Sequence, residues 1–351
     1  MRLNWQRESR WMEGEGPHSD VVVSSRIRLA RNLSHLPFPG FMTPSQEEEM
    51  IRLAESAIQR DRVTNVAGKL ELIPLWELTE LEKQLLVEKH LISPELARAR
   101  GKKAVILSED EAFSIMINEE DHLRIQCLLP ALRLEEGWEK SDALDDALGE
   151  ELDYAFNEEK GYLTACPTNV GTGLRASTMV HLPGLMLTRQ AGEVLTALTK
   201  IGIAVRGLYG EGTEAQGNFF QISNQISLGL SEEEIIKNLS AAALRLADQE
   251  RQARELLKQQ RPYFLEDRVG RAYGILAHGY ILSSQEALQL LSDLRLGVAT
   301  GFLPLTLGKI NQLMVKIQPS YLQLLYGREM NPWERDVCRA RLVREFLKEA
   351  A

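Results

Sequence analysis

The chain has 351 residues, and 44% of them are hydrophobic, which is enough apolar material for two domains with packed cores. The formal net charge of −9 argues against broad nucleic-acid binding, and three cysteines are too few for a disulfide scaffold and favour a reducing cytoplasm. No signal-peptide core begins the chain and no apolar run approaches the roughly 18 residues of a membrane span, so we expect a cytoplasmic protein with no membrane partner.

Residues 1–20 are polar and predict a loosely packed N-terminal arm, after which residues 21–23 predict a short strand. The strand runs into residues 24–31, SSRIRLAR. In an extended segment, residues two apart point to the same face, so Arg26 and Arg28 can reach one ligand together. The alternative is a solvated edge strand, whose basic side chains guard against aggregation.

Two capping boxes predict helix starts, one at residues 43–46 and one at residues 79–82. His90 ends the second of these helices. A lone histidine at this position is typically structural or compensates the helix dipole.

An acidic turn follows two predicted strands at residues 104–107 and 113–117. It has the sequence NEEDHLR over residues 118–124, and the apolar alternation of a strand then resumes. A hairpin of this kind places Glu120 and Arg124 beside the same cleft. The alternative is a simple surface turn.

The stretch from Cys166 to Ser177, CPTNVGTGLRAS, combines a cysteine, two glycines and an arginine. Glycines let a backbone pass close to a ligand, and Arg175 offers a planar fork of donors suited to phosphate oxygens. The alternative is a buried cysteine before an ordinary Gly-Thr loop. Further on, residues 206–221 form a Gly-rich acidic loop.

The composition becomes strongly helical from Ser231, where a capping box begins a long apolar stripe that ends at Pro262. We therefore expect three parts: an arm at residues 1–20, a first domain at residues 21–258, and a helical C-terminal domain at residues 259–351.

Four blocks stand in one order and together resemble the phosphagen (guanidino) kinases, such as arginine kinase and creatine kinase. They are SSRIRLAR, NEEDHLRI, CPTNVGTGLRAS and RGLYGEGTEAQGNFFQISN, within residues 24–224. The whole-chain layout is most similar to the bacterial protein-arginine kinases of that family. The resemblance implies an α+β fold, in which a mainly antiparallel sheet flanked by helices forms the catalytic domain and an all-helical C-terminal domain follows.

The resemblance also implies the site residues. Glu120 and Glu211 would bind the substrate guanidinium, and Cys166 would orient it. The implied ATP-binding positions are Ser24, Ser25, Arg26, Ile27, Arg28, His90, Arg124, Arg175, Ala176, Ser177, Thr178, Met179, Arg206, Gly207, Leu208, Tyr209 and Gly210. No P-loop and no HRD or DFG motif is present, so arginines must hold the phosphates. Mg²⁺ would be carried by ATP, with no metal site in the protein itself.

Three departures from the family pattern bear on the substrate. Common phosphagen kinases carry a helical domain before the first block, whereas 23 residues precede it here. Met179 stands where common relatives have a histidine that touches the nucleotide, and Gln221 replaces an acidic residue. Without the helical domain we expect a more open site, which suits a large substrate.

The C-terminal region contains the sequence ERDVCRA at residues 334–340. On a helix, Arg335 and Arg339 are neighbours at i,i+4, and Asp336 pairs with Arg339 at i,i+3. By pattern alone this is a solvated charged face. The motif RDxxRA, however, resembles the phosphoarginine-receptor motif of protein-arginine kinases, which implies a second, regulatory phosphoarginine site in a domain that also serves dimerisation.

The resemblance implies ATP-dependent phosphorylation of arginine side chains in proteins, within heat-shock protein quality control. The implied partners are protein substrates with exposed arginines, an McsA-type activator, the ClpC–ClpP protease, a CtsR-type repressor and further copies of the chain in a homo-oligomer. A kinase of free arginine is the alternative enzyme, and a non-catalytic phosphoarginine reader is the alternative outside catalysis. The presence of Glu120, Cys166 and Glu211 together argues against the reader.

Overall fold

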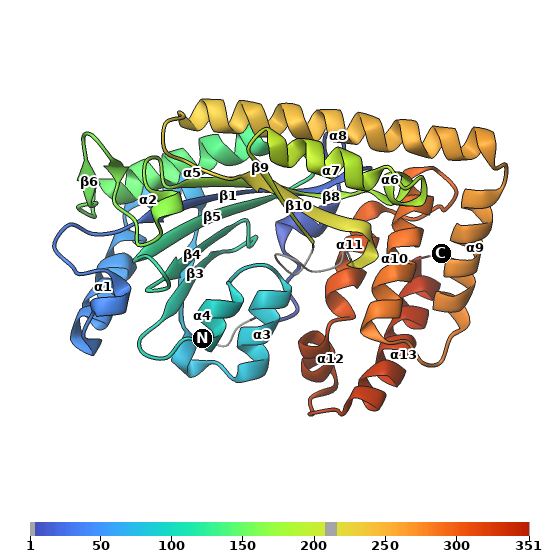
Figure 1. The fold of residues 1–351 in the computed structure, drawn as a ribbon. Coiled ribbons are helices and arrows are strands. Elements are labelled where there is room, and N and C mark those ends of the chain that lie inside the picture. Colours follow the sequence, from blue (N-terminus) through green and yellow to red (C-terminus); the bar gives the residue numbers. More distant parts are fainter. Residues whose placement is uncertain (1–3, 208–215, 351) are drawn as a thin grey trace.

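The computed structural model describes residues 4–207 and 216–350, and an eight-stranded sheet forms its centre (Figure 1). The strand order is β2-β3-β4-β5-β1-β8-β10-β9, and every neighbouring pair is antiparallel. The predicted α+β class is confirmed. The strands of this sheet are β1 (Val22–Arg31), β2 (Leu70–Pro74), β3 (Ala104–Ser108), β4 (Phe113–Ile117), β5 (Leu123–Pro130), β8 (Leu174–His181), β9 (Ile203–Gly207) and β10 (Phe219–Asn224), and a separate hairpin contains β6 (Phe156–Asn157) and β7 (Gly161–Tyr162).

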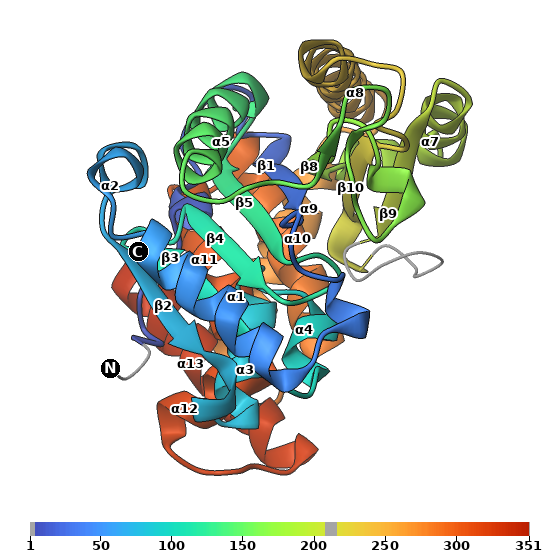
Figure 2. The same cartoon turned by 90° about the vertical axis from the view of Figure 1, so that its left-hand side faces the viewer.

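One face of the sheet is apolar and is covered by helices, which lie above the sheet in both views (Figures 1 and 2). Ile27 and Leu29 of β1 point into this core and are fully buried. Because strand side chains alternate, Arg26 and Arg28 point to the opposite face. The covering helices are α5 (Leu134–Gly149), α7 (Ala191–Lys200) and α8 (Glu232–Gln260), and the same core extends to α1 (Pro44–Ala57), α2 (Asp61–Ala67) and α6 (Pro183–Leu187).

The opposite face, which carries the arginines, is covered only towards its two ends. At one end α3 (Glu80–Glu88) and α4 (Pro94–Arg98) pack on β3 and β4 through a small apolar cluster that includes Met116. At the other end the C-terminal helices pack on Leu128 and Phe219. The sheet surface between these two contacts is where the candidate site lies.

The C-terminal region is all-helical, as predicted, and the long helix α8 spans from the sheet to it (Figure 1). The capping boxes predicted at Thr43, Thr79 and Ser231 are all present, each with both of its reciprocal hydrogen bonds. The C-terminal helices are α9 (Phe264–His278), α10 (Ser284–Ala299), α11 (Leu307–Lys316), α12 (Pro319–Tyr326) and α13 (Pro332–Ala350).

The N-terminal arm is well packed, and the prediction of a loose arm is wrong. Trp11 and Met12 are 2% and 3% exposed and belong to the apolar core of the C-terminal helices. The indole Nε1 of Trp11 donates to the carbonyl of Lys89 at 3.2 Å. Glu8 forms an ion pair with Lys316 at 2.9 Å. The mostly polar composition of the arm does not predict this packing. The two large apolar side chains of Trp11 and Met12 are enough to anchor a short segment.

Candidate active site

Strand pairing gathers the predicted arginines on one face of the sheet. Arg28 of β1 lies opposite Arg175 of β8, and Arg26 is two residues earlier on the same face. Ala30 of β1 lies opposite Arg124 of β5. Directly opposed residues of an antiparallel pair share a face, so all four arginines point the same way.

The same face continues through β8, β10 and β9. Gln221 of β10 lies opposite both Met179 of β8 and Arg206 of β9. The Arg26 guanidinium donates from Nη2 to Oε1 of Gln221 at 2.7 Å. The amide at position 221 therefore holds an arginine side chain without adding a negative charge to the site.

A cavity of about 710 Å³ lies over this face, between α3 and α4 on one side and the C-terminal helices on the other. Arg26, Arg28, Arg124 and Arg206 line it from the sheet. Its size is within the range of small-molecule sites, so it is the candidate nucleotide site.

Arg26 and Arg28 are half-buried and surrounded by like charge. Burial lowers the pKa of Arg26 to about 9, and the positive charges of Arg124, Arg175 and Arg206 act in the same direction. Burial and the neighbouring arginines hold the pKa of Arg28 well below its usual range. The Nε atom of Arg28 is buried without a hydrogen-bond partner among the residues that the structure describes. Clustered, partly desolvated cations favour an anionic ligand, and phosphate oxygens match their donors.

His90 lies at one end of the cavity, where a φ of 62° turns the chain after α3. Its ring centroid is 5.5 Å from that of Trp11, and its carbonyl accepts from Nε2 of Gln126 at 2.9 Å. Burial, and then the charge of Arg26, lower the pKa of His90 to about 4. The imidazole is therefore neutral at neutral pH, which suits contact with a nucleotide base and excludes compensation of the helix dipole by a positive charge.

The opposite end of the line of arginines meets two adjacent carboxylates. Glu119 is nearly buried and accepts from Nη1 of Arg124 at 2.5 Å and from the hydroxyl of Ser93. Glu120 is exposed and lies near Cys166, whose Sγ atom is 3.0 Å from the hydroxyl oxygen of Thr168. Partial burial and the neighbouring acids raise the pKa of Glu120, whereas Arg124 and Cys166 act in the opposite direction. Sequence reasoning pointed to Glu120 but missed the positioning role of Glu119, although the NEED motif contains both.

These groups form a line across the sheet. Arg26 interacts electrostatically with His90, and Arg28 interacts with Glu119, Arg124 and Arg175. The line therefore runs from an apolar aromatic end, through a cationic centre, to an acidic end beside a thiol.

Some predicted nucleotide-binding side chains point away from the cavity. Ser25, Ile27, Ala176 and Thr178 alternate with the residues of the arginine face and are buried on the other side of the sheet. The main-chain groups of these residues largely take part in the pairing between strands. Their side chains pack on the face of the sheet opposite the arginines.

The remaining predicted positions divide into those on the arginine face and those without a described structure. Ser24, Ser177 and Met179 lie on the arginine face, and Gly207 lines the cavity. Four predicted residues lie outside the described ranges: Leu208, Tyr209, Gly210 and Glu211.

Many of the residues that line the cavity were not predicted from the sequence, and three of them are large apolar side chains from outside the predicted catalytic blocks. Trp11 comes from the arm, Leu288 from α10 and Met314 from α11, and all three line the cavity. Each is an apolar residue in a helical segment, which sequence reasoning assigns to a core.

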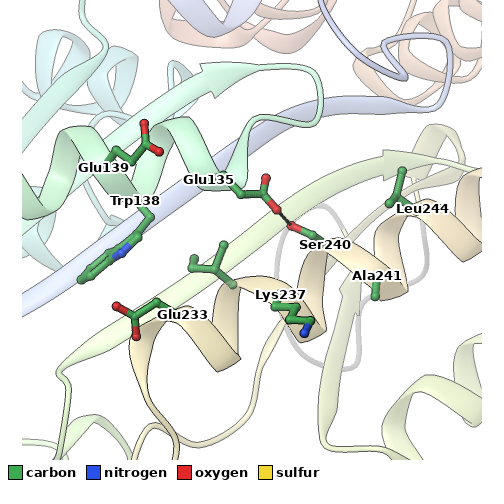
Figure 3. A pocket seen from close by; sticks show the side chains of 9 residues that line it. Glu135, Trp138, Glu139, Glu233, Lys237, Ser240, Ala241 and Leu244 are labelled. Atoms are coloured by element: carbon green, nitrogen blue, oxygen red, sulfur yellow. Dashed lines mark hydrogen bonds between the residues drawn. The ribbon is translucent and has the colours of Figure 1, made fainter.

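A second cavity, of about 480 Å³, lies between α5 and α8 on the helix-covered side (Figure 3). Ser240 of α8 donates to Glu135 of α5 at 2.6 Å across it, and Trp138 forms part of its wall. No predicted site residue lines this cavity, and it has no arginine among its described lining residues. It is therefore a groove between packed helices and is separate from the candidate active site.

The ERDVCRA segment lies on α13, and its two arginines have different environments. Arg339 is 1% exposed and donates to the carbonyls of Ile317 at 2.8 Å and Leu282 at 2.7 Å. It also pairs with Asp336 at 2.5 Å. Arg335 is half-buried and donates to the carbonyl of Met330 at 2.7 Å. Arg339 is thus not on a solvated face, although Arg335 and Asp336 remain accessible.

No helix in residues 4–207 and 216–350 is both long enough and apolar enough to cross a membrane.

The arginine-lined cavity is suited to an anionic ligand, and comparison with known proteins identifies the class of enzyme. Residues 49–253 match the family model described as ATP:guanido phosphotransferase, C-terminal catalytic domain. Residues 262–351 match the model described as Protein-arginine kinase McsB C-terminal domain. The chain therefore belongs to the ATP:guanido phosphotransferase, or phosphagen kinase, family, and it has the C-terminal domain of that family's protein-arginine kinases.

Full-length relatives agree with this assignment, which confirms the predicted family. The chain is 65% identical over 348 residues to the protein-arginine kinase of Moorella thermoacetica, covering 99% of each chain. It is 56% identical over 341 residues to that of Symbiobacterium thermophilum, covering 97% of each chain. Among solved structures, lombricine kinase is similar with a TM-score of 0.57 at 28% identity, over 70% of this chain and 69% of that chain.

Proposed function

We propose that this protein transfers the γ-phosphoryl group of ATP to arginine side chains of other proteins. The observation that carries the proposal is the order of groups across the sheet face: neutral His90, Arg26 and Arg28 line the cavity, and Glu120 beside Cys166 lies beyond its lining, next to Glu119 and Arg124. A nucleotide base, a triphosphate and a guanidinium match these three environments in that order. The names of the full-length relatives support the same activity.

The arginines are the proposed phosphate ligands. Phosphoryl transfer requires mainly positioning and electrostatic stabilisation, and one arginine on the moving phosphoryl group can contribute on the order of 10³–10⁵ in rate. Arg124 is the best-oriented candidate for that role, because Glu119 fixes its guanidinium next to the acceptor end. Arg26, Arg28, Arg175 and Arg206 then serve the rest of the triphosphate.

Glu120 and Glu211 are the proposed partners of the acceptor guanidinium. A guanidinium has a pKa above ~12 and an ordinary glutamate one near ~4.3, so complete proton transfer before attack would cost about 10 kcal/mol. The raised pKa of Glu120 narrows this difference without removing it. The carboxylates therefore align the attacking nitrogen with the γ-phosphorus. As the N–P bond forms and the bond to ADP breaks, they take the proton late.

A protein-borne arginine fits the acceptor end better than free arginine does. Glu120 is exposed and Cys166 is partly exposed, so this end of the line opens to solvent. The N-terminal arm does not close it, because Trp11 and Met12 pack with the C-terminal helices at the other end. An arginine side chain on a larger protein can therefore enter from the open side.

We expect Mg²⁺ to be carried on ATP. Among the described residues, no group of three His, Cys, Asp or Glu side chains could hold a metal ion by itself. On the nucleotide, Mg²⁺ would neutralise charge on the phosphate oxygens, and the arginines would supply the remaining positive charge.

Regulation and cellular role extend this proposal. We propose that Arg335, Asp336 and Arg339 form a regulatory phosphoarginine site, in which accessible Arg335 and Asp336 contact the ligand and buried Arg339 orients Asp336. Phosphoarginine would mark proteins for ClpC–ClpP and inactivate a CtsR-type repressor in the cytoplasm. An McsA-type activator and homo-oligomerisation through the C-terminal domain would control the activity. The match to the C-terminal domain of protein-arginine kinases supports this extension.

The deciding experiment compares two acceptors. The protein is incubated with MgATP and either casein or an equal concentration of free arginine, and products are identified by mass spectrometry at neutral pH. We expect acid-labile phosphate on casein arginines at a higher rate than on free arginine. Equal or faster modification of free arginine would replace the proposal with a phosphagen kinase, and no arginine phosphate at all would reject both enzymes.

A further inference from the structure

The C-terminal helices reach into the cavity that holds the candidate nucleotide site. Leu288 of α10 and Met314 of α11 line the same cavity as His90 and Arg26. Both side chains are almost fully buried, and both belong to a core that also includes Trp11. One continuous space is therefore bounded by the arm, the catalytic sheet and the C-terminal domain.

Leu288, Met314 and Trp11 form an apolar wall of the cavity, and the position of this wall determines which part of a bound nucleotide it can contact. The phosphates must lie over Arg28 and Arg124, because these arginines form the cationic centre beside the acceptor carboxylates. The base of the same nucleotide then lies towards His90 and Trp11, whose rings are 5.5 Å apart. A purine is flat and largely apolar on its faces, so it favours aromatic and aliphatic walls.

We infer that Leu288 and Met314 of the C-terminal domain, together with Trp11 of the arm, form the wall against which the nucleotide base packs. This inference rests on the proposed function, because it takes ATP as the ligand. It makes the C-terminal domain part of the substrate-binding machinery. The nucleotide affinity of the enzyme then depends on how the two domains are held together.

The contacts that hold this wall in place are specific. The Glu88 carboxylate, at the end of α3, accepts from the main-chain N–H groups of Ser320 at 2.9 Å and Tyr321 at 3.2 Å, at the start of α12. A carboxylate at a helix N-terminus is a favourable contact. Because His90 follows Glu88 by two residues, the segment that carries the histidine also anchors the C-terminal domain.

Arg339 is hydrogen-bonded to the ends of both helices that carry Leu288 and Met314. Its guanidinium donates to the carbonyl of Leu282, just before α10, and to the carbonyl of Ile317, just after α11. These two helices carry Leu288 and Met314. The conformation of α13 is therefore coupled by direct hydrogen bonds to both helices that form the base wall.

The test separates base binding from phosphate binding. Calorimetry on the 351-residue protein measures the affinity for ATP and for inorganic tripolyphosphate, which has the phosphates without the base. Met314→Ala removes part of the wall, and Met314→Phe fills part of the cavity while preserving an apolar core. We expect each variant to bind ATP about 5- to 20-fold more weakly, with tripolyphosphate affinity unchanged.

The matched control is Leu291→Ala. Leu291 is buried on the same helix and in the same core as Leu288 but does not line the cavity. The ratio of ATP affinity to tripolyphosphate affinity should therefore stay as in the wild type. Unchanged ATP affinity in both Met314 variants, or an equal loss of ATP and tripolyphosphate affinity, would overturn the inference. If wild-type protein phosphorylates casein arginines while the Met314 variants retain ATP affinity, only the inference fails. If wild-type protein binds no ATP, both the inference and the proposed function fail.

Discussion

The guanidinium of Arg124 donates from Nη1 to the carboxylate oxygen Oε2 of Glu119, at a distance of 2.5 Å. Glu119 also accepts from the hydroxyl of Ser93, so its carboxylate is committed to contacts within the protein. The next residue, Glu120, is exposed and lies beside Cys166. The two adjacent acids therefore have different environments, and we propose different roles for them: Glu119 positions an arginine, and Glu120 contacts the substrate.

The first prediction separates these two roles. Glu120→Gln should lower kcat for casein phosphorylation by about 10²-fold or more, because an amide cannot take the proton or pair with the guanidinium. ATP affinity in calorimetry should be retained. Glu119→Gln should weaken ATP binding as well as turnover, because Arg124 loses its charged partner. Glu211→Ala is expected to resemble Glu120→Gln.

The control for this pair is Glu109→Gln, an exposed glutamate in the turn between β3 and β4. It should have wild-type kinetics. Near-normal turnover of Glu120→Gln would show that a different carboxylate holds the acceptor.

The second prediction concerns the phosphate-binding arginines. Arg175→Ala and Arg206→Ala should each weaken ATP binding by about 1.5–3 kcal/mol, the usual loss for a charged hydrogen-bond set. Calorimetry at constant salt concentration measures this. Arg133→Ala is the control, because Arg133 pairs with Glu136 on α5 and does not belong to the sheet face on which Arg175 lies opposite Arg28. If both site variants kept wild-type affinity for ATP, these two arginines would not be phosphate ligands.

The third prediction is a pH dependence at the contact between the domains. Burial raises the pKa of Glu88 from 4.5 to about 7, while the hydrogen bonds from Ser320 and Tyr321 oppose the shift. An acid whose pKa is higher in the folded state binds more protons when folded. Its stabilising contribution is therefore complete below pH 4.5 and is lost as the pH rises to about 7, and it amounts to about 3 kcal/mol at most.

Glu88→Gln tests this dependence, because glutamine stays neutral at every pH. The free energy of unfolding of the wild type, relative to that of Glu88→Gln, should fall between pH 5 and pH 7.5 in urea denaturation. Glu77→Gln, at an exposed glutamate, is the control and should show no such trend. A constant difference between wild type and Glu88→Gln would mean that Glu88 is already ionised throughout this range.

The fourth prediction divides the RDVCRA segment into a ligand-contacting part and a structural part. The double variant Arg335→Ala with Asp336→Ala should lose binding of free phosphoarginine in calorimetry while keeping its ATP affinity. Arg339→Ala should instead lower Tm, because the carbonyls of Leu282 and Ile317 lose a buried donor. Wild-type phosphoarginine binding by the double variant would leave Arg335 and Asp336 as a salt-bridged helix surface.

Local patterns in the sequence determined much of the fold and the cationic part of the site. The alternation along β1 placed Arg26 and Arg28 on one face because side chains in a strand alternate with a period of two. The capping box at Ser231 placed the start of α8 correctly, because its hydrogen bonds join residues only three apart. Such features depend on near neighbours in the chain, so the sequence alone could predict them.

The tertiary structure alone decided which distant segments meet. Trp11 is near His90, and Met314 lines the same cavity, although these residues belong to the arm, the catalytic domain and the C-terminal domain. Arg339 is buried, whereas its helical spacing predicted a solvated face. No local pattern encodes these contacts, because they arise when separate apolar surfaces pack into one core and enclose whatever side chains lie between them.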